Sequence, residues 1–147
     1  MRNFTLIIFF FISFTYSINA QLVIGTPSLG FSQACANESF NTYYVTFTFS
    51  PEASLSATNQ FIIELSDNTG SFSNSTIVYT SAQGEITQSP ATLGFSLPTN
   101  TAGESYKVRI KSTAPSATST GSVSFPAYYK IQDEPFSINN LISTAVF

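Results

Sequence analysis

The side chains of this 147-residue chain that could do acid, base or metal chemistry are few and scattered. Glu64 and Asp67 lie on and just after one candidate strand, and Glu104 precedes another. A glycosidase holds two carboxylates roughly 5 to 10 Å apart in a cleft, and no spacing in this sequence brings such a pair together. We therefore expect solvated carboxylates. The alternative is a loop calcium site that uses Asp67, Asn68, Asp133 or Glu134.

The inventory of reactive side chains excludes several reaction types. The sequence has no His, no Trp and one Cys, so it lacks a Ser-His-Asp triad, a Cys-His pair and a structural zinc site. No glycine-rich loop precedes a helical pattern, so a phosphate cradle is missing as well. We expect a protein that is not an enzyme and holds no cofactor and no metal.

Aromatic side chains offer a binding surface instead. Tyr43 and Tyr44 are adjacent in a strand-like run, and so are Tyr128 and Tyr129. Because successive side chains of a strand point to opposite faces, one ring of each pair faces away from the core. Parity with the apolar residues of each run assigns Tyr44 and Tyr128 to the outside, where exposed rings stack on sugars or anchor protein contacts. The alternative is that a neighbouring domain covers these rings.

Basic side chains gather in one run. Lys107, Arg109 and Lys111 alternate with Val108 and Ile110, which predicts a cationic stripe on the outer face of one strand. Such a stripe attracts an anionic polysaccharide, or it keeps an exposed strand from pairing with a neighbour. Beyond the first 20 residues the chain carries four basic and eight acidic side chains. We therefore expect no nucleic-acid partner.

Residues 1–20 have the pattern of an export signal peptide. A positively charged start precedes an apolar stretch that is too short to span a membrane. We expect cleavage after Ala20, which would make Gln21 the mature N-terminus; the alternative is cleavage after Ser17. Residues 21–147 would then form one domain, secreted or held at the outer cell surface through the general secretory pathway, without a transmembrane segment.

The exported part alternates between apolar and polar residues with the period of half-buried strands. Such runs lie at 43–49, 61–65, 76–80, 93–97, 106–111 and 126–131, with a first strand at 22–24 or nearer 29–31. The low-complexity segment 112–121 is expected to be a loop, and no apolar set recurs with the period of a helix. About seven short strands predict an all-β sandwich of immunoglobulin-like or fibronectin type III-like architecture.

The inward side chains of these runs define the expected core, which is Val45, Phe47, Phe49, Phe61, Ile63, Leu65, Phe95, Leu97, Tyr106, Val108 and Ile110. Tyr106 follows Pro98 and Gly103 as in the corner before the sixth strand of such sandwiches, where a Tyr hydroxyl bonds to upstream backbone. The alternative for Tyr106 is an ordinary core tyrosine with its hydroxyl at the surface.

Several blocks taken together resemble a known family. The blocks are FTFSPE at 47–52, NQFIIELSD at 59–67, FSLPT at 95–99, YKVRIKST at 106–113 and FSINN at 136–140. They resemble the N-terminal region of large secreted Bacteroidetes surface proteins that end in a type B sorting domain of the type IX secretion system, often described as gliding-motility-associated. The resemblance spans roughly residues 33 to 147 and includes no catalytic signature.

The resemblance implies passage across the outer membrane and a surface role built on repeated β modules. The family's C-terminal sorting domain is missing, so we expect an N-terminal fragment of a longer multi-domain protein, or another route to the surface. Family members tend to carry a further Cys just beyond the position of Phe147, which implies a disulfide between Cys35 and a partner outside this chain. The alternative for Cys35 is a small buried apolar residue.

Three classes of function compete on this basis. The first is a non-catalytic structural or adhesive module of a secreted or cell-surface protein, linked to gliding motility or surface attachment, that contacts neighbouring β domains or other surface proteins. The second is a carbohydrate-binding module that uses exposed Tyr rings. The third is a pilus-type subunit completed by a donor strand, for which a missing core strand would be the sign.

Overall fold

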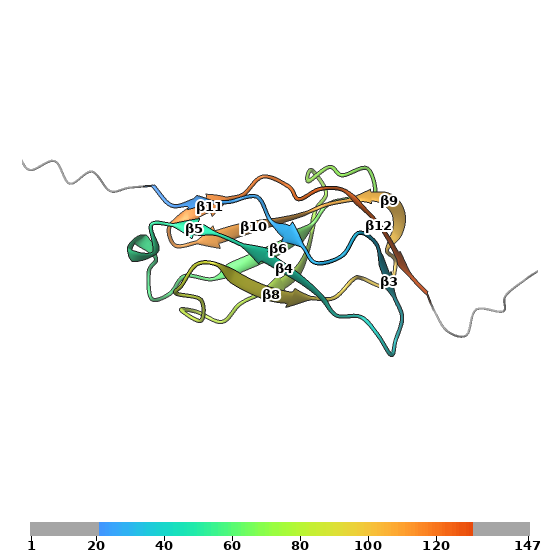
Figure 1. The fold of residues 1–147 in the computed structure, drawn as a ribbon, viewed down its shortest axis with the longest axis horizontal. Coiled ribbons are helices and arrows are strands. Elements are labelled where there is room, and N and C mark those ends of the chain that lie inside the picture. The colour runs from blue at the N-terminus through green and yellow to red at the C-terminus, as the bar shows by residue number, and fades with distance from the viewer. Residues whose placement is uncertain (1–20, 131–147) are drawn as a thin grey trace, which may run out of the picture.

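The computed structural model describes residues 21–130, which form a two-layered β-sandwich (Figure 1). The expected signal peptide, Asp133 and Glu134 lie outside these residues. Besides a short 3-10 helix η1 (Glu52–Ser54), the elements are β1 (Val23–Ile24), β2 (Ser28–Leu29), β3 (Ala34–Ala36), β4 (Tyr43–Phe47), β5 (Phe49–Ser50), β6 (Phe61–Leu65), β7 (Thr76–Thr80), β8 (Ala91–Phe95), β9 (Ala102–Tyr106), β10 (Val108–Thr113), β11 (Ser116–Thr118) and β12 (Phe125–Tyr129).

The strands form the two layers of the predicted sandwich. One layer has the order β2-β4-β8, and the antiparallel pair of β1 with β5 extends it because β5 follows β4 directly. The other layer has the order β11-β10-β6-β7, and the group β3-β12-β9 extends it because β9 precedes β10 and β12 follows β11. Seven strands, as expected from the sequence, result when β1 to β3 are counted as one segment that crosses from one layer to the other, and β4-β5, β9-β10 and β11-β12 as one strand each. In Figure 1, β4 and β8 lie in front of β6 and β10.

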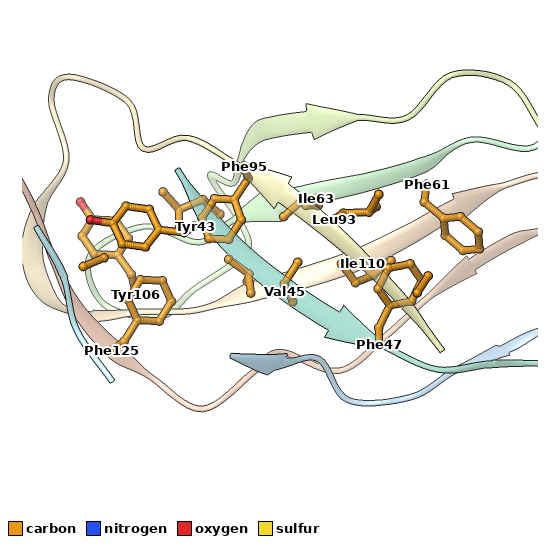
Figure 2. Packing of buried hydrophobic residues seen from close by; sticks show 14 of the residues in the cluster. Tyr43, Val45, Phe47, Phe61, Ile63, Leu93, Phe95, Tyr106, Ile110 and Phe125 are labelled. Carbon is orange, nitrogen blue, oxygen red and sulfur yellow. The ribbon is translucent and has the colours of Figure 1, made fainter. Parts of the chain in front are cut away.

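The core between the layers confirms the inward parity predicted for each run. All eleven expected core residues are at most 8% exposed, and Tyr43, Leu93 and Phe125 join them. Figure 2 shows a line of packed side chains between the sheets, with Tyr106 and Phe125 at one end. The alternation of apolar and polar residues therefore predicts which side chains are buried, because each strand has one face toward the core and one face toward solvent.

The Tyr106 corner is also confirmed. The hydroxyl of Tyr106 accepts a hydrogen bond from the backbone N–H of Ala102 at 3.2 Å, four residues upstream. The ring itself is buried at the end of β9. The chain then passes from pairing with β12 to pairing with β6 at Lys107, so the expected single strand 106–111 is two segments.

Two expectations about chain segments were wrong. The low-complexity segment 112–121 is not simply a loop, because β10 runs to Thr113 and β11 pairs with it antiparallel. Ser and Thr side chains fit a pleated sheet, but a run of them carries no apolar alternation that sequence reading could detect. The first strand is not one of two alternatives either, since both β1 and β2 form and each pairs with a different part of the chain.

Candidate functional site

The outward tyrosines lie where strand parity predicts. Tyr44 is 59% exposed and Tyr128 is 41% exposed, whereas Tyr43 is buried. Tyr129 is partly buried against the core. Tyr44 belongs to β4 and Tyr128 to β12, strands that do not pair with each other.

Tyr128 is engaged by a neighbouring carboxylate. Its hydroxyl donates a hydrogen bond to an oxygen of Glu104 on β9. This bond raises the pKa of Tyr128 above its usual value of 10.0, because a phenol that donates to a carboxylate resists ionisation. The residue beside it across the parallel pair of β12 and β3 is Cys35. Tyr128 is therefore exposed, but its hydroxyl is already hydrogen-bonded to another residue of the domain.

Cys35 is exposed on β3. The alternative that it is a small buried apolar residue is wrong, because strand alternation turns Ala34 and Ala36 inward and leaves the thiol between them outside. An exposed thiol is accessible to a partner from outside the chain, so the expected external disulfide remains a prediction.

The cationic stripe faces outward as predicted, but two of its members are already paired. Arg109 Nε lies 2.6 Å from Glu64 Oε2, and Lys111 Nζ lies 3.2 Å from Glu64 Oε1. The guanidinium of Arg109 also stacks on the Phe72 ring, 4.4 Å from its centroid. Lys107 has no ion pair among residues 21–130 and is partly buried. The single carboxylate of Glu64 thus offsets one of the three positive charges that would attract an anionic polysaccharide.

The expected role of the stripe in guarding an exposed strand is also wrong. Strand β10 lies between β6 and β11, so its backbone groups are paired on both sides. The cations instead cover Glu64, which stands opposite Arg109 across the pair of β6 and β10. Sequence reading missed this carboxylate as their partner, because residues 45 and 47 positions apart meet only through the strand register.

Glu64 is a carboxylate on the outer face that its neighbours have nearly covered. Its side chain is 8% exposed, against 25% for Arg109 and 38% for Lys111. Burial alone would raise the pKa of the Glu64 carboxyl, but the hydrogen bonds and charges of the two cations outweigh it and lower the pKa below its usual 4.5. The ion pairs therefore favour the folded state wherever Glu64 is ionised.

We expect Glu64→Gln to lower the free energy of unfolding by about 1 to 3 kcal/mol at pH 7, because charge-assisted hydrogen bonds to a covered carboxylate are lost. The contribution is complete above the unfolded pKa, which is the usual 4.5, and disappears as the pH falls through the lower folded pKa. Urea unfolding followed by circular dichroism measures the difference in unfolding free energy between parent and variant at pH 7 and at about pH 2, where we expect it to be lost.

The matched control for this variant is Glu38→Gln, because Glu38 is an exposed carboxylate outside the ion pairs. We expect its unfolding free energy to stay within about 0.5 kcal/mol of the parent at both pH values. A Glu64→Gln protein as stable as the parent at pH 7 would contradict the role assigned to the ion pairs.

Asp67 serves a turn. Its Oδ1 accepts hydrogen bonds from the Thr69 N–H at 2.9 Å, the Thr69 hydroxyl at 2.7 Å and the Ser71 N–H at 2.9 Å. These bonds lower its pKa below the usual 3.8. Asp67 and Asn68 border a hollow of about 240 Å³ beside Asn100. No group of three His, Cys, Asp or Glu side chains that could hold a metal occurs in residues 21–130. The other two candidate ligands of the calcium alternative, Asp133 and Glu134, lie outside this range.

The sheet face around Tyr44 is uncharged, unlike the face on which Glu64 pairs with Arg109 and Lys111. Strands β2, β4 and β8 contain no charged residue. Tyr44 stands opposite Gly94 across the pair of β4 and β8, and Thr46 stands opposite Thr92 with their hydroxyls 2.8 Å apart. An uncharged, hydroxyl-lined sheet face with one exposed ring is the arrangement that best suits binding. Sequence parity identified the ring but not the glycine beneath it.

Comparisons with protein-family models, curated proteins and solved structures found no match to this chain. Within residues 21–130, no helix is long and apolar enough to cross a membrane. The assignment of surface roles therefore rests on the geometry described above and on the resemblance of the sequence blocks.

Proposed function

We propose that the chain is a non-catalytic structural or adhesive module of an exported cell-surface protein. The observation that carries this proposal is the direction of the chain. The described residues enter the sandwich at one end of its long axis and leave it at the other (Figure 1). Because residue 130 lies at one end of the long axis, far from the start of the domain, β modules that follow it can extend the protein lengthwise, as the resemblance implies.

The pilus-type alternative has no supporting observation. In the seven-strand arrangement that residues 21–130 form, every position is filled by the chain itself. A subunit that waits for a donor strand would leave one core position open to a partner. The exposed rings and the open sheet faces support contacts made through surfaces instead.

The proposal is tested in cells that produce the protein. Deleting residues 21–130 behind the export signal should lower the attachment of the cells to a solid surface, because the module that makes or positions the contact is gone. A second variant replaces the same residues with an unrelated β-sandwich of similar length. Restored attachment in that variant assigns a spacer role, and continued loss assigns an adhesive role. Unchanged attachment in both variants would contradict the proposal.

Surface location is controlled through the exposed thiol of Cys35. A membrane-impermeant maleimide, applied to intact cells with and without an impermeant reductant, should label the Cys35 peptide of the parent protein, which mass spectrometry identifies after digestion. In the Cys35→Ser control this peptide should stay unlabelled under both conditions. Labelling that appears only with reductant indicates the external disulfide. Labelling that appears only after lysis would refute the cell-surface assignment.

A further inference from the structure

The Tyr44 ring lies over its neighbouring strand. The Tyr44 Cε1 and Cδ1 atoms are 3.4 and 3.7 Å from where a β-carbon on Gly94 would be, so the ring leans across the glycine instead of standing clear of the sheet. A β-carbon on Gly94 would be in ordinary van der Waals contact with this ring. Because Gly94 has no side chain, the Tyr44 ring can lie close to the backbone of the neighbouring strand.

One consequence of the packing of Tyr44 on Gly94 is structural. An aromatic ring that covers a cross-strand glycine shields the backbone and stabilises the sheet, and this alone would explain the pair. The exposure of the ring adds a second consequence. Tyr44 remains 59% exposed, and its hydroxyl makes no hydrogen bond with any residue between 21 and 130. The ring is supported from below and open to solvent above.

The surroundings of the ring are polar and uncharged. Thr46 and Thr92 share a hydrogen bond of 2.8 Å, and Ser96 Oγ donates to the Asn41 carbonyl at 2.6 Å. Each hydroxyl keeps further hydrogen-bonding capacity, since it has one donor and two acceptor positions. The methyl group of Thr42 lies 3.9 Å from the same point above Gly94. Hydroxyl groups thus flank an exposed aromatic platform.

We propose that this face, centred on Tyr44, binds a neutral polysaccharide by stacking one sugar ring on the tyrosine while the flanking hydroxyls bond to sugar hydroxyls. Sugar rings present an apolar C–H face to an aromatic ring and hydroxyls around their edge, which matches this arrangement. The proposal deepens the proposed function, on which it rests, by naming the class of surface that an adhesive module would hold.

Charge selects a neutral ligand over an acidic one. Strands β2, β4 and β8 contain no basic residue that could pair with a uronate or sulfate. The cations Arg109 and Lys111 belong to the other layer and are paired with Glu64. The second exposed tyrosine, Tyr128, already donates its hydroxyl to Glu104. Tyr44 is the exposed tyrosine whose surroundings leave both the ring and the hydroxyl available.

The test is titration calorimetry of the exported full chain with neutral hexasaccharides of glucose, mannose and N-acetylglucosamine, and with hexagalacturonate as the acidic comparator. We expect at least one neutral hexasaccharide to bind more tightly than hexagalacturonate. Tyr44→Ala should weaken this binding by about tenfold, because the stacked ring is lost. Tyr44→Phe keeps the ring and should remain within about threefold of the parent.

The matched control is Tyr128→Ala, which removes an exposed tyrosine outside this face and should leave the affinity unchanged. Circular dichroism and urea unfolding of each variant separate lost binding from lost folding. The proposal is overturned if no neutral hexasaccharide binds, if hexagalacturonate binds more tightly, or if folded Tyr44→Ala binds like the parent. It is also overturned if the parent forms a dimer that Tyr44→Ala abolishes, since a second copy would then occupy the face.

These outcomes are separate from those of the attachment experiment. Cells can lose attachment on deletion of residues 21–130 although the purified chain binds none of the hexasaccharides, in which case the adhesive role stands and the sugar proposal fails. Conversely, sugar binding by a chain that the impermeant maleimide never reaches would leave the Tyr44 site intact and refute the cell-surface role.

Discussion

Replacing Phe47 by alanine should lower the free energy of unfolding by about 3 to 5 kcal/mol. Phe47 is 2% exposed, and its ring centroid lies 5.1 Å from that of Phe61 and 6.0 Å from that of Phe49. Phe61 belongs to β6 in the opposite layer, so the Phe47 ring fills space between the two sheets (Figure 2). Alanine would lose the buried surface of the ring and leave a cavity that the stiff strands cannot close.

Urea unfolding followed by circular dichroism measures this loss, and Phe40→Ala is its matched control. Phe40 is 57% exposed, and its ring makes an edge contact with that of Tyr43, with the centroids 5.8 Å apart. Its replacement should cost less than about 1 kcal/mol. Equal losses for the two variants, or a soluble Phe47→Ala protein of unchanged stability, would show that the core has been misassigned.

Phe47 illustrates how much of this fold was predictable from the sequence. Along β4 and β5 every second residue is apolar, and in a strand this pattern puts all of these side chains on the same face, which is the buried one. The same logic located β6, β8 and β10 and turned Tyr44 outward. It gave no boundary for β11, because β11 is held by pairing with β10 and not by an alternation of its own.

The candidate site was only half predictable for the same reason. Parity says which way a side chain points, but the neighbour across the strands depends on register, which forms through pairing between distant segments. Register sets Glu64 beside Arg109 and Gly94 beside Tyr44. These neighbours decide what each side chain can bind. Glu64 neutralises the charge of Arg109, whereas Gly94 leaves the ring of Tyr44 exposed. Equivalent exposed groups in the sequence thus become unequal candidates for binding.

Asn59 shows the same dependence on distant pairing inside the protein. It is 3% exposed and precedes β6, and its Oδ1 accepts hydrogen bonds from the end of β10 and the residue after it. The donors are the Ser112 hydroxyl at 2.7 Å, the Thr113 N–H at 3.1 Å and the Ala114 N–H at 2.8 Å. One buried oxygen therefore satisfies two backbone donors where β10 turns toward β11.

Asn59→Ala should lower the free energy of unfolding by about 2 to 4 kcal/mol, because the substitution leaves buried donors without their acceptor. The Ala114 N–H is the more affected of the two backbone donors, since the Thr113 N–H also bonds to the Gln60 carbonyl at 3.1 Å. Urea unfolding measures the loss. Asn100→Ala removes an exposed amide and should change stability by less than about 0.5 kcal/mol.

Asn59→Asp separates the acceptor oxygen from the rest of the amide. The Nδ2 group of Asn59 is buried without a partner, and in aspartate an oxygen without a donor takes its place while the other oxygen keeps the hydrogen bonds of Oδ1. The cost of the substitution is the burial of a charge, which hydrogen bonds from backbone N–H groups reduce. We expect Asn59→Asp to be more stable than Asn59→Ala at pH 7. The opposite order would mean that the charge outweighs the retained hydrogen bonds, and an Asn59→Ala protein as stable as the parent would show that the turn does not depend on this acceptor.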